Sequence, residues 1–236
     1  MWVFPLVAAV VAFVFAWSLA RRFAARRHGY ELVWAIALVM YGVASLAVVI
    51  GALRGWSELA FETYWAFGAV LNVPFLAVGE LQLLVKRRPV HLGLYLVLVF
   101  VTSYALSVLG GASLDKMALA AGLPSGKHVF GDGSAAHRLP QLISIPSYLV
   151  LLGGALWSAW RMRGRPELRD RFIGTLLIAG GATLIAGFGS AFAALGNLAG
   201  FAVSLCAGIS VMFLGFLRAS RPAPSSSTVQ VPVLPS

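Results

Sequence analysis

The stretch Trp2–Arg27 reads WVFPLVAAVVAFVFAWSLARRFAARR, and its pattern decides the fold. Its first part, Trp2–Ala20, carries no charge, and four arginines follow within residues 21–27. The hydrocarbon core of a bilayer needs about 20 apolar residues per helix, so this run is long enough to cross it. A cleaved signal peptide has its basic residues before the apolar core, whereas here they come after it. The stretch therefore predicts a retained transmembrane helix.

The same pattern recurs along the chain, which is 60% hydrophobic and only 11% charged. Soluble domains are usually about a quarter charged, so the composition indicates a membrane protein. The six further apolar runs are Leu32–Leu53, Leu59–Val85, Val90–Gly110, Leu142–Trp160, Phe172–Leu195 and Gly196–Leu217. We therefore expect an all-α bundle of seven transmembrane helices over residues 1–221. The segment 222–236 has four prolines and three consecutive serines, which predicts a disordered cytoplasmic tail.

Lysine and arginine are distributed unequally between the two sides of this bundle. Fourteen lie in the connections after the first, third and fifth runs and after the seventh, and four lie in the other connections. Cytoplasmic connections carry the excess of positive charge. The pattern predicts a multi-pass protein of the cell membrane, with its N-terminus outside and its C-terminus in the cytoplasm. Because the basic residues separate apolar runs, the net charge of +10 does not indicate nucleic-acid binding.

The one long connection, residues 111–141, is then external. We expect Ser113 to cap a short helix, Leu114–Ala121, which lies on the membrane surface. His128, Asp132 and His137 in the same loop are residue types that bind metals, but their spacing matches no compact metal-binding motif. A surface loop without a metal is the favoured interpretation, and metal binding is left open.

The third run holds the acids that we consider first as functional candidates. Ionisable groups within a membrane are costly and usually face the interior of a bundle. Glu62 and Glu80 are 18 residues apart, five turns of an α-helix, and would share a face. Asn72 lies between them, and Pro74 frees the carbonyl of Val70 because proline has no N–H. The functional hypothesis is a ligand or proton site on this face. The alternative is that Glu80 pairs with a cytoplasmic arginine or bonds a neighbouring hydroxyl, and that Glu62 lies in water at the outer interface.

Small residues in the last two runs recur every four positions, a spacing that lets two helices approach closely. They are Ala179, Thr183, Gly187 and Ala191 in the sixth run, and Gly196, Gly200, Ser204 and Gly208 in the seventh. The prediction is contact between these two helices. Formation of a homodimer through one of these faces is the alternative.

No motif for catalysis, phosphate binding or haem binding occurs in the sequence. Seven helices with an external N-terminus resemble the microbial rhodopsins, but the seventh run lacks the lysine that binds retinal in that family. We therefore expect a non-enzymatic receptor, sensor or accessory protein that binds a membrane lipid, another small apolar molecule or a partner membrane protein. Isolated hydroxyls such as those of Tyr104 and Tyr148 would supply its polar contacts. The alternative is a small-solute or proton-coupled transporter that uses Glu80; an enzyme is less favoured, and no cofactor is indicated.

Overall fold

The computed structural model describes residues 1–120 and 122–221, and these residues form helices and connections without a β-strand. Seven helical spans are long and apolar enough to cross a membrane, as the sequence predicted. The single helices are α1 (Val3–Arg26), α2 (Gly29–Arg54), α5 (Arg88–Gly110) and α11 (Leu198–Ala219). The other three spans are Glu58–Leu84, Ala135–Met162 and Pro166–Ala194. We call them span 3, span 5 and span 6, and the protein is a multi-pass membrane protein by this criterion.

Spans 3, 5 and 6 are each divided by a π-helical segment. Span 3 consists of α3 (Glu58–Thr63), η1 (Tyr64–Leu71) and α4 (Asn72–Leu84). Span 5 consists of α7 (Ala135–Leu139), η3 (Pro140–Ser144) and α8 (Ile145–Met162). Span 6 consists of η4 (Pro166–Leu168), α9 (Arg169–Thr183), η5 (Leu184–Gly189) and α10 (Ser190–Ala194). The sequence predicted a break in span 3 at Pro74, but it did not predict that the interruptions take the form of π-helical segments.

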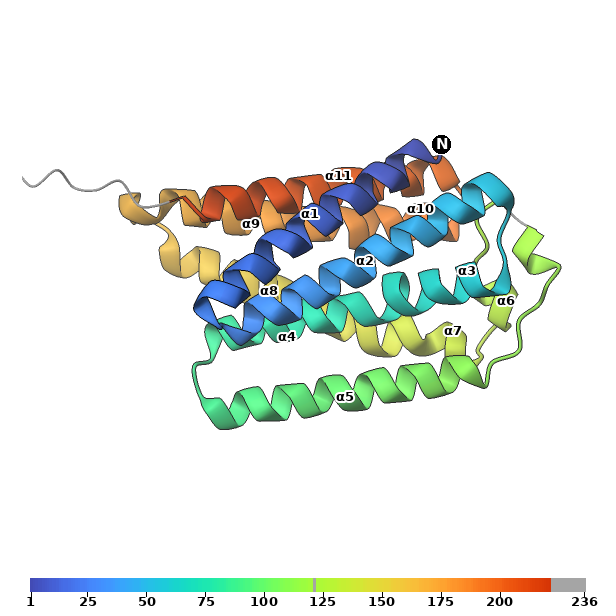
Figure 1. The fold of residues 1–236 in the computed structure, drawn as a ribbon, viewed down its shortest axis with the longest axis horizontal. Helices are drawn as coiled ribbons and strands as arrows, with labels where there is room; N and C mark the ends of the chain where they lie inside the picture. Colours follow the sequence, from blue (N-terminus) through green and yellow to red (C-terminus); the bar gives the residue numbers. More distant parts are fainter. Residues whose placement is uncertain (121, 222–236) are drawn as a thin grey trace, which may run out of the picture.

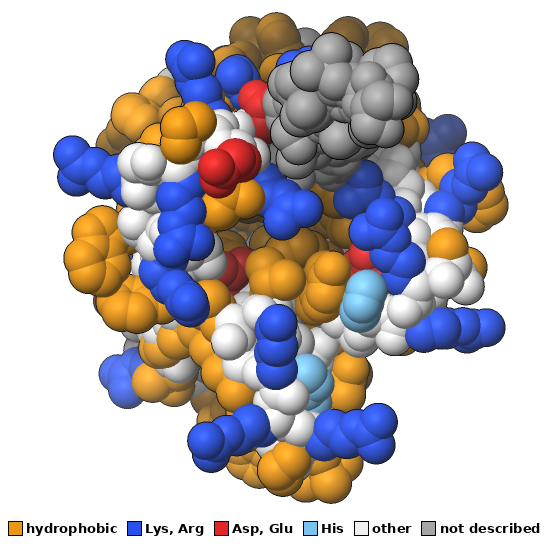
Figure 2. Space-filling model, turned by 90° about the vertical axis from the view of Figure 1, so that its left-hand side faces the viewer, with side chains coloured by type: hydrophobic (Ala, Val, Ile, Leu, Met, Phe, Trp, Pro, Cys, Tyr) orange, Lys and Arg blue, Asp and Glu red, His pale blue; other side chains and the backbone are white. Residues whose placement is uncertain are grey.

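The spans run the length of an elongated bundle with chemically different ends (Figure 1). One end, which we call the arginine end, carries the connections α1–α2, α4–α5 and α8–α9 together with the end of α11. Figure 2 views this end and shows lysine and arginine side chains around a hollowed apolar centre, with a few acids between them. The other end, the loop end, carries residues 111–134. The structure thus separates the two sets of basic residues as the sequence predicted, while the orientation in a membrane stays a prediction.

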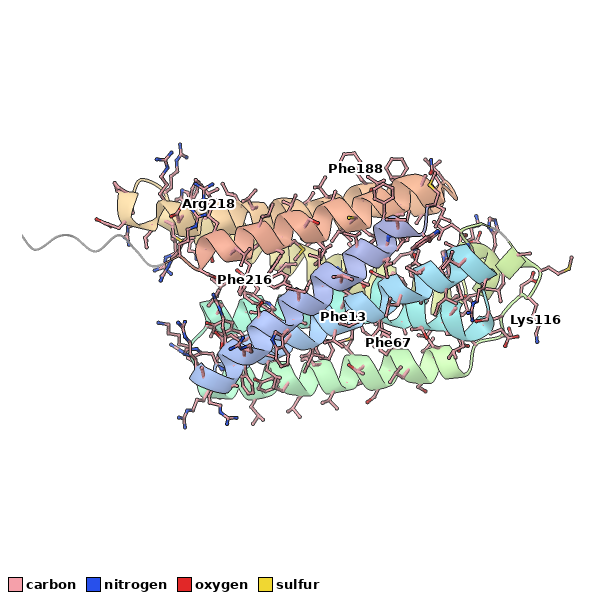
Figure 3. The ribbon with its side chains drawn as sticks, turned by 45° about the horizontal axis from the view of Figure 1, so that its top comes forward. Phe13, Phe67, Lys116, Phe188, Phe216 and Arg218 are labelled. Carbon is pink, nitrogen blue, oxygen red and sulfur yellow. The ribbon has the colours of Figure 1, made fainter. Side chains whose placement is uncertain are left out.

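The helices α1, α2, α9 and α11 form the most closely packed part of the bundle, and α5 lies at its edge. Gly42 of α2 accommodates the ring of Phe13 of α1 (Figure 3), because a Cβ at Gly42 would lie 2.8 Å from that ring. At the arginine end, Arg22 lies over the ring of Phe216 at 4.4 Å. The Arg218 side chain (Figure 3) donates to Asp170 at 3.1 Å, which ties α11 to α9.

Four glycines let α9 and α11 approach each other closely. A Cβ at Gly181 would lie 2.5 Å from the carbonyl oxygen of Gly208, and one at Gly174 would lie 2.5 Å from that of Gly215. Gly208, which the sequence placed in the contact, therefore lies there. Gly187 does not, since no atom lies within 4 Å of a Cβ built on it.

The other two glycines of the predicted stripes act within the connection between span 6 and α11. Gly196 occupies this tight turn with a φ of +65°, a conformation that L side chains rarely adopt. Gly200 accommodates the ring of Phe192, since a Cβ there would lie 2.5 Å from it. The glycines at which the two helices come closest are therefore spaced by seven residues on each helix.

The loop differs from its prediction. Instead of a helix over residues 114–121, the described residues form only a 3-10 turn, Ala118–Ala120. The cap is Asp115, not Ser113: its carboxylate accepts from the backbone N–H of Met117 at 2.8 Å. A second short helix, α6 (Gly126–Phe130), packs onto the bundle. The predicted tail, residues 222–236, lies outside the described residues.

Candidate functional site

A cavity of about 680 Å³ lies between α2, spans 3, 5 and 6, and α11, in the half of the bundle toward the loop end. Its volume is within the range of small-molecule sites, about 300–1,000 Å³. Most of the wall is apolar, with small residues such as Ala44, Gly68 and Ala182 beside larger ones such as Leu205 and Ile209. α1 and α5 do not contribute to the wall. The space between the helices of a bundle is one of the places where small-molecule sites commonly occur.

All three π-helical segments contribute to this wall. Gly68 and Ala69 come from η1, Pro140 and Ser144 from η3, and Gly187 from η5. A π-helical turn contains an extra residue, widens the helix locally and often marks a functional site. Here the segments come from three different spans and converge on one space. The wider π-helical turns thus help to form the cavity.

Ser144 explains how span 3 tolerates its π-helical segment. Pro74 provides no N–H to the preceding turn, so the carbonyl of Val70 lacks its usual α-helical donor. The hydroxyl of Ser144 donates to this carbonyl at 3.0 Å and is shared with the carbonyl of Ala69 at 2.7 Å. The freed carbonyl of Val70 was predicted from the sequence, but its partner from span 5 was not. This bond joins two walls of the cavity.

Two buried polar side chains in the wall remain available to a ligand. Ser45 of α2 is 2% exposed and Asn72 of α4 is 5% exposed, and both line the cavity. Neither side chain hydrogen-bonds to another residue in the part of the chain that the structure describes. Asn72, one of the sequence candidates, lies near the middle of the 27-residue span 3. Ser45 was not singled out from the sequence, because a serine in an apolar helix carries no signal of its own.

Two of the three tyrosines of the wall are already engaged in hydrogen bonds. Tyr41 donates its hydroxyl to the carbonyl of Leu205 at 2.9 Å, which links α2 to α11. Tyr148, a sequence candidate, shares a hydrogen bond of 2.8 Å with Thr183 across spans 5 and 6. Tyr104, the other tyrosine candidate, lies on α5, away from the cavity, where it stacks on Phe100 and is 44% exposed. The structure therefore brings Tyr148 and Asn72 to one site and leaves Tyr104 on the outer surface.

The loop covers the cavity because aromatic residues hold it in place. The indole N–H of Trp56 donates to the carbonyl of Gly122, and that of Trp65 donates to Ala136, both at 3.1 Å. Gly126 packs directly on the ring of Trp65, and Phe130 contacts the same ring at a centroid distance of 5.6 Å. The sequence placed this loop on the surface and did not reveal its role as a cover. The sequence feature that could have predicted this packing is the presence of aromatic residues both in the loop and at the facing end of the bundle.

Glu80 lies outside the cavity wall, one turn toward the arginine end from Leu76, which lines it. Its side chain is buried, at 6% exposure, and packs against Gly154 of α8: a Cβ there would lie 2.7 Å from Glu80 Cγ. The hydroxyl of Ser158, one turn along α8, neighbours the carboxyl group. Among the described residues, no basic side chain lies within 4.0 Å of this carboxylate. Of the two partners that the alternative allowed, the arginine is thus not found there, whereas a neighbouring hydroxyl, that of Ser158, is present.

Glu62 lies at the loop end of span 3, partly exposed and away from the cavity. The prediction that it shares a face with Glu80 assumed an unbroken α-helix. The π-helical segment η1 lies between the two acids and changes the phase of the helix. A third acid, Glu31 of α2, was missed: it is 2% exposed, and its nearest basic atom is Nδ1 of His28 at 4.0 Å.

Of the loop residues His128, Asp132 and His137, the first two have separate partners. Asp132 pairs with Lys127 at 3.1 Å, and this hydrogen bond and charge lower the pKa of the Asp132 carboxyl. His128 Nδ1 lies 3.3 Å from the Ser125 hydroxyl, whereas His137 lines the cavity. Within residues 1–120 and 122–221, no three His, Cys, Asp or Glu side chains are grouped so as to hold a metal ion.

Comparison with known protein families, with curated proteins and with solved structures gives no match to this chain. The class of the protein is therefore defined by its own fold and cavity: a multi-pass membrane protein of seven helical spans.

Proposed function

We propose that this is a non-enzymatic membrane protein of receptor, sensor or accessory type that binds a small apolar molecule in the cavity. One observation carries the proposal: a largely apolar space of about 680 Å³ is lined by Asn72, a buried amide that makes no side-chain hydrogen bond within residues 1–120 and 122–221. An unpaired buried polar group costs about 1–3 kcal/mol, and a ligand that hydrogen-bonds to Asn72 would remove this cost. Apolar walls with a few placed polar groups are typical of small-molecule sites.

The test is the content of the purified protein. Protein purified in mild detergent is denatured, extracted and analysed by mass spectrometry for a stoichiometric small molecule. Asn72→Leu keeps the side-chain size but removes the amide, and should lower the amount of bound molecule several-fold. Gln82→Leu is the matched control, because Gln82 is a buried, unpartnered amide of the same helix that does not line the cavity. Equal content in both variants, or none in the parent, would argue against the proposal.

The second candidate is proton-coupled transport of a small solute through Glu80. It is supported by the burial of this carboxylate without a basic partner, one turn from the cavity. A carboxyl group in this position can exchange a proton without breaking an ion pair. In liposomes that contain a pH-sensitive dye, the parent should move protons and Glu80→Gln should not. Glu62→Gln, on the same span but at the loop end, is the control and should behave as the parent.

A further inference from the structure

The cavity has a side opening between spans 5 and 6. Among the wall residues from the transmembrane spans, those that are exposed come only from these two: Gln141 and Ile145 on span 5, and Gly187, Ser190 and Ala194 on span 6. The wall residues of α2, span 3 and α11 are all buried or half-buried. The cavity therefore meets the outer surface at one side of the bundle.

The path of the helices produces this opening. α8 packs on α9, and Tyr148 and Thr183 join the two spans by a hydrogen bond near the middle of their length. Toward the loop end the two spans separate: α10 packs on η5 and α11, whereas α7 packs on η3, α5 and α6. Figure 1 shows α7 and α10 apart at this end. Gly187 lies on the edge of the opening, with no atom within 4 Å of a Cβ built there.

The surroundings of the opening are those of a lipid-facing surface. Large apolar side chains project outward around it, among them Leu142 at 63%, Leu149 at 60% and Phe188 at 58% exposure. Phe188 points away from the bundle in Figure 3. The pinned loop covers the cavity at the loop end, and only Lys127 and His128 of its wall residues there are exposed. A molecule that is dissolved in the hydrocarbon of the bilayer thus meets the opening directly.

We infer that the cavity receives the acyl chain of a membrane lipid, which enters sideways between spans 5 and 6 from the leaflet at the loop end. This inference rests on the proposed function and names its ligand class. The positive-inside rule predicts this leaflet to be the outer one. The polar head group would stay at the membrane surface near Gln141 and the loop. The chain would pass Gly187 and Ile145 into the apolar space.

The inference is tested with photoreactive lipid. The protein is reconstituted into phosphatidylcholine vesicles that contain a phosphatidylcholine with a diazirine in its acyl chain, and labelled residues are located by mass spectrometry. In the parent, buried wall residues such as Ser45 and Leu205 should be labelled, along with lipid-facing residues of α5. Gly187→Trp should close the opening and lower labelling of the wall at least fivefold, with α5 labelled as before. Gly180→Trp is the matched control, because Gly180 also lies in open space, seven residues earlier, outside the wall.

A second matched pair guards against a variant that fails to fold. Ile145→Trp should reduce labelling of the wall, whereas Leu149→Trp, one turn along α8 and outside the wall, should not. If the wall is labelled equally in the parent and in both blocking variants, the sideways route is wrong while the binding function survives. If only α5 is labelled in the parent, lipid binding fails as well. A covalent dimer formed through a photoreactive residue at position 145 would place a second copy over the opening and overturn the inference.

Discussion

At the scale of single residues, the cavity depends on Ser144 replacing a hydrogen bond that Pro74 removes. The hydroxyl reaches the carbonyls of Ala69 and Val70 at 2.7 and 3.0 Å. Hydrogen bonds between membrane helices contribute about 0.6–2 kcal/mol each. Besides its contribution to stability, this hydrogen bond fixes the distance between spans 3 and 5.

Ser144→Ala should therefore lower the free energy of unfolding by about 1–2 kcal/mol. Adding Pro74→Ala restores an N–H at position 74, so the double variant should lose less than the sum of the single losses. Unfolding of the purified protein in detergent measures these values. Ser147→Ala is the control, since the hydroxyl of Ser147 donates to Ile143 of its own span. Additive losses would mean that Ser144 does not serve the carbonyl freed by Pro74.

The Lys127–Asp132 pair at the loop end gives a prediction on pH. Lys127 lowers the pKa of the Asp132 carboxyl, so the pair is formed above the usual value of 3.8 and is lost as the pH falls through the lowered pKa. Lys127→Met should raise the pKa of Asp132 toward 3.8, as measured by carbon NMR of labelled aspartate. Lys116→Met, whose lysine pairs instead with Glu58, should leave that pKa unchanged.

At the scale of elements, the contact of α9 with α11 depends on glycines spaced by seven residues. Gly174 faces Gly215 and Gly181 faces Gly208, each close enough for a Cβ to meet a backbone oxygen. In a membrane, such close approach replaces the hydrophobic driving force that water would supply. This contact holds span 6 against α11, and both contribute residues to the cavity wall.

Gly181→Leu should separate α9 from α11 and destabilise the protein by about 1–3 kcal/mol, the usual cost of overpacking. Gly187→Leu in the same span should have little effect on stability, because the space beside it is open. It should instead reduce the volume available to a ligand. Thermal unfolding in detergent compares the two. Equal melting temperatures would contradict the assignment of the contact to Gly181.

At the scale of the whole molecule, charge and cavity are placed at opposite ends. The arginine end carries most of the basic residues around the hollow seen in Figure 2, and the cavity lies toward the loop end. If the positive-inside rule holds, the cavity belongs to the outer half of the membrane. The ligand would then come from outside the cytoplasm.

The orientation can be measured with an impermeant maleimide on intact cells. In a Cys206→Ala background, Met117→Cys in the loop should react, because Met117 is 86% exposed. Arg165→Cys at the arginine end should react only after the cells are lysed. Reaction of both residues in intact cells would overturn the seven-span topology, and reaction of Arg165→Cys alone would reverse its orientation.

The sequence by itself determined the number of spans, their approximate bounds and the separation of basic residues, because these properties depend on local hydropathy and charge. It also indicated Glu80 and Asn72 as buried and Pro74 as a break in the hydrogen-bonding ladder. Only the tertiary structure showed that the hydroxyl of Ser144 replaces the donor that Pro74 lacks. It also showed that Asn72 lines a cavity while Tyr104 does not, and that the loop covers this cavity. These features depend on contacts between residues that are tens of positions apart in the sequence. In addition, a π-helical turn changes the number of residues per turn, so a face predicted from α-helical spacing is displaced beyond it. Contacts of this kind arise from packing between helices, and the residue pattern of a single helix does not specify which residues of another helix it will contact.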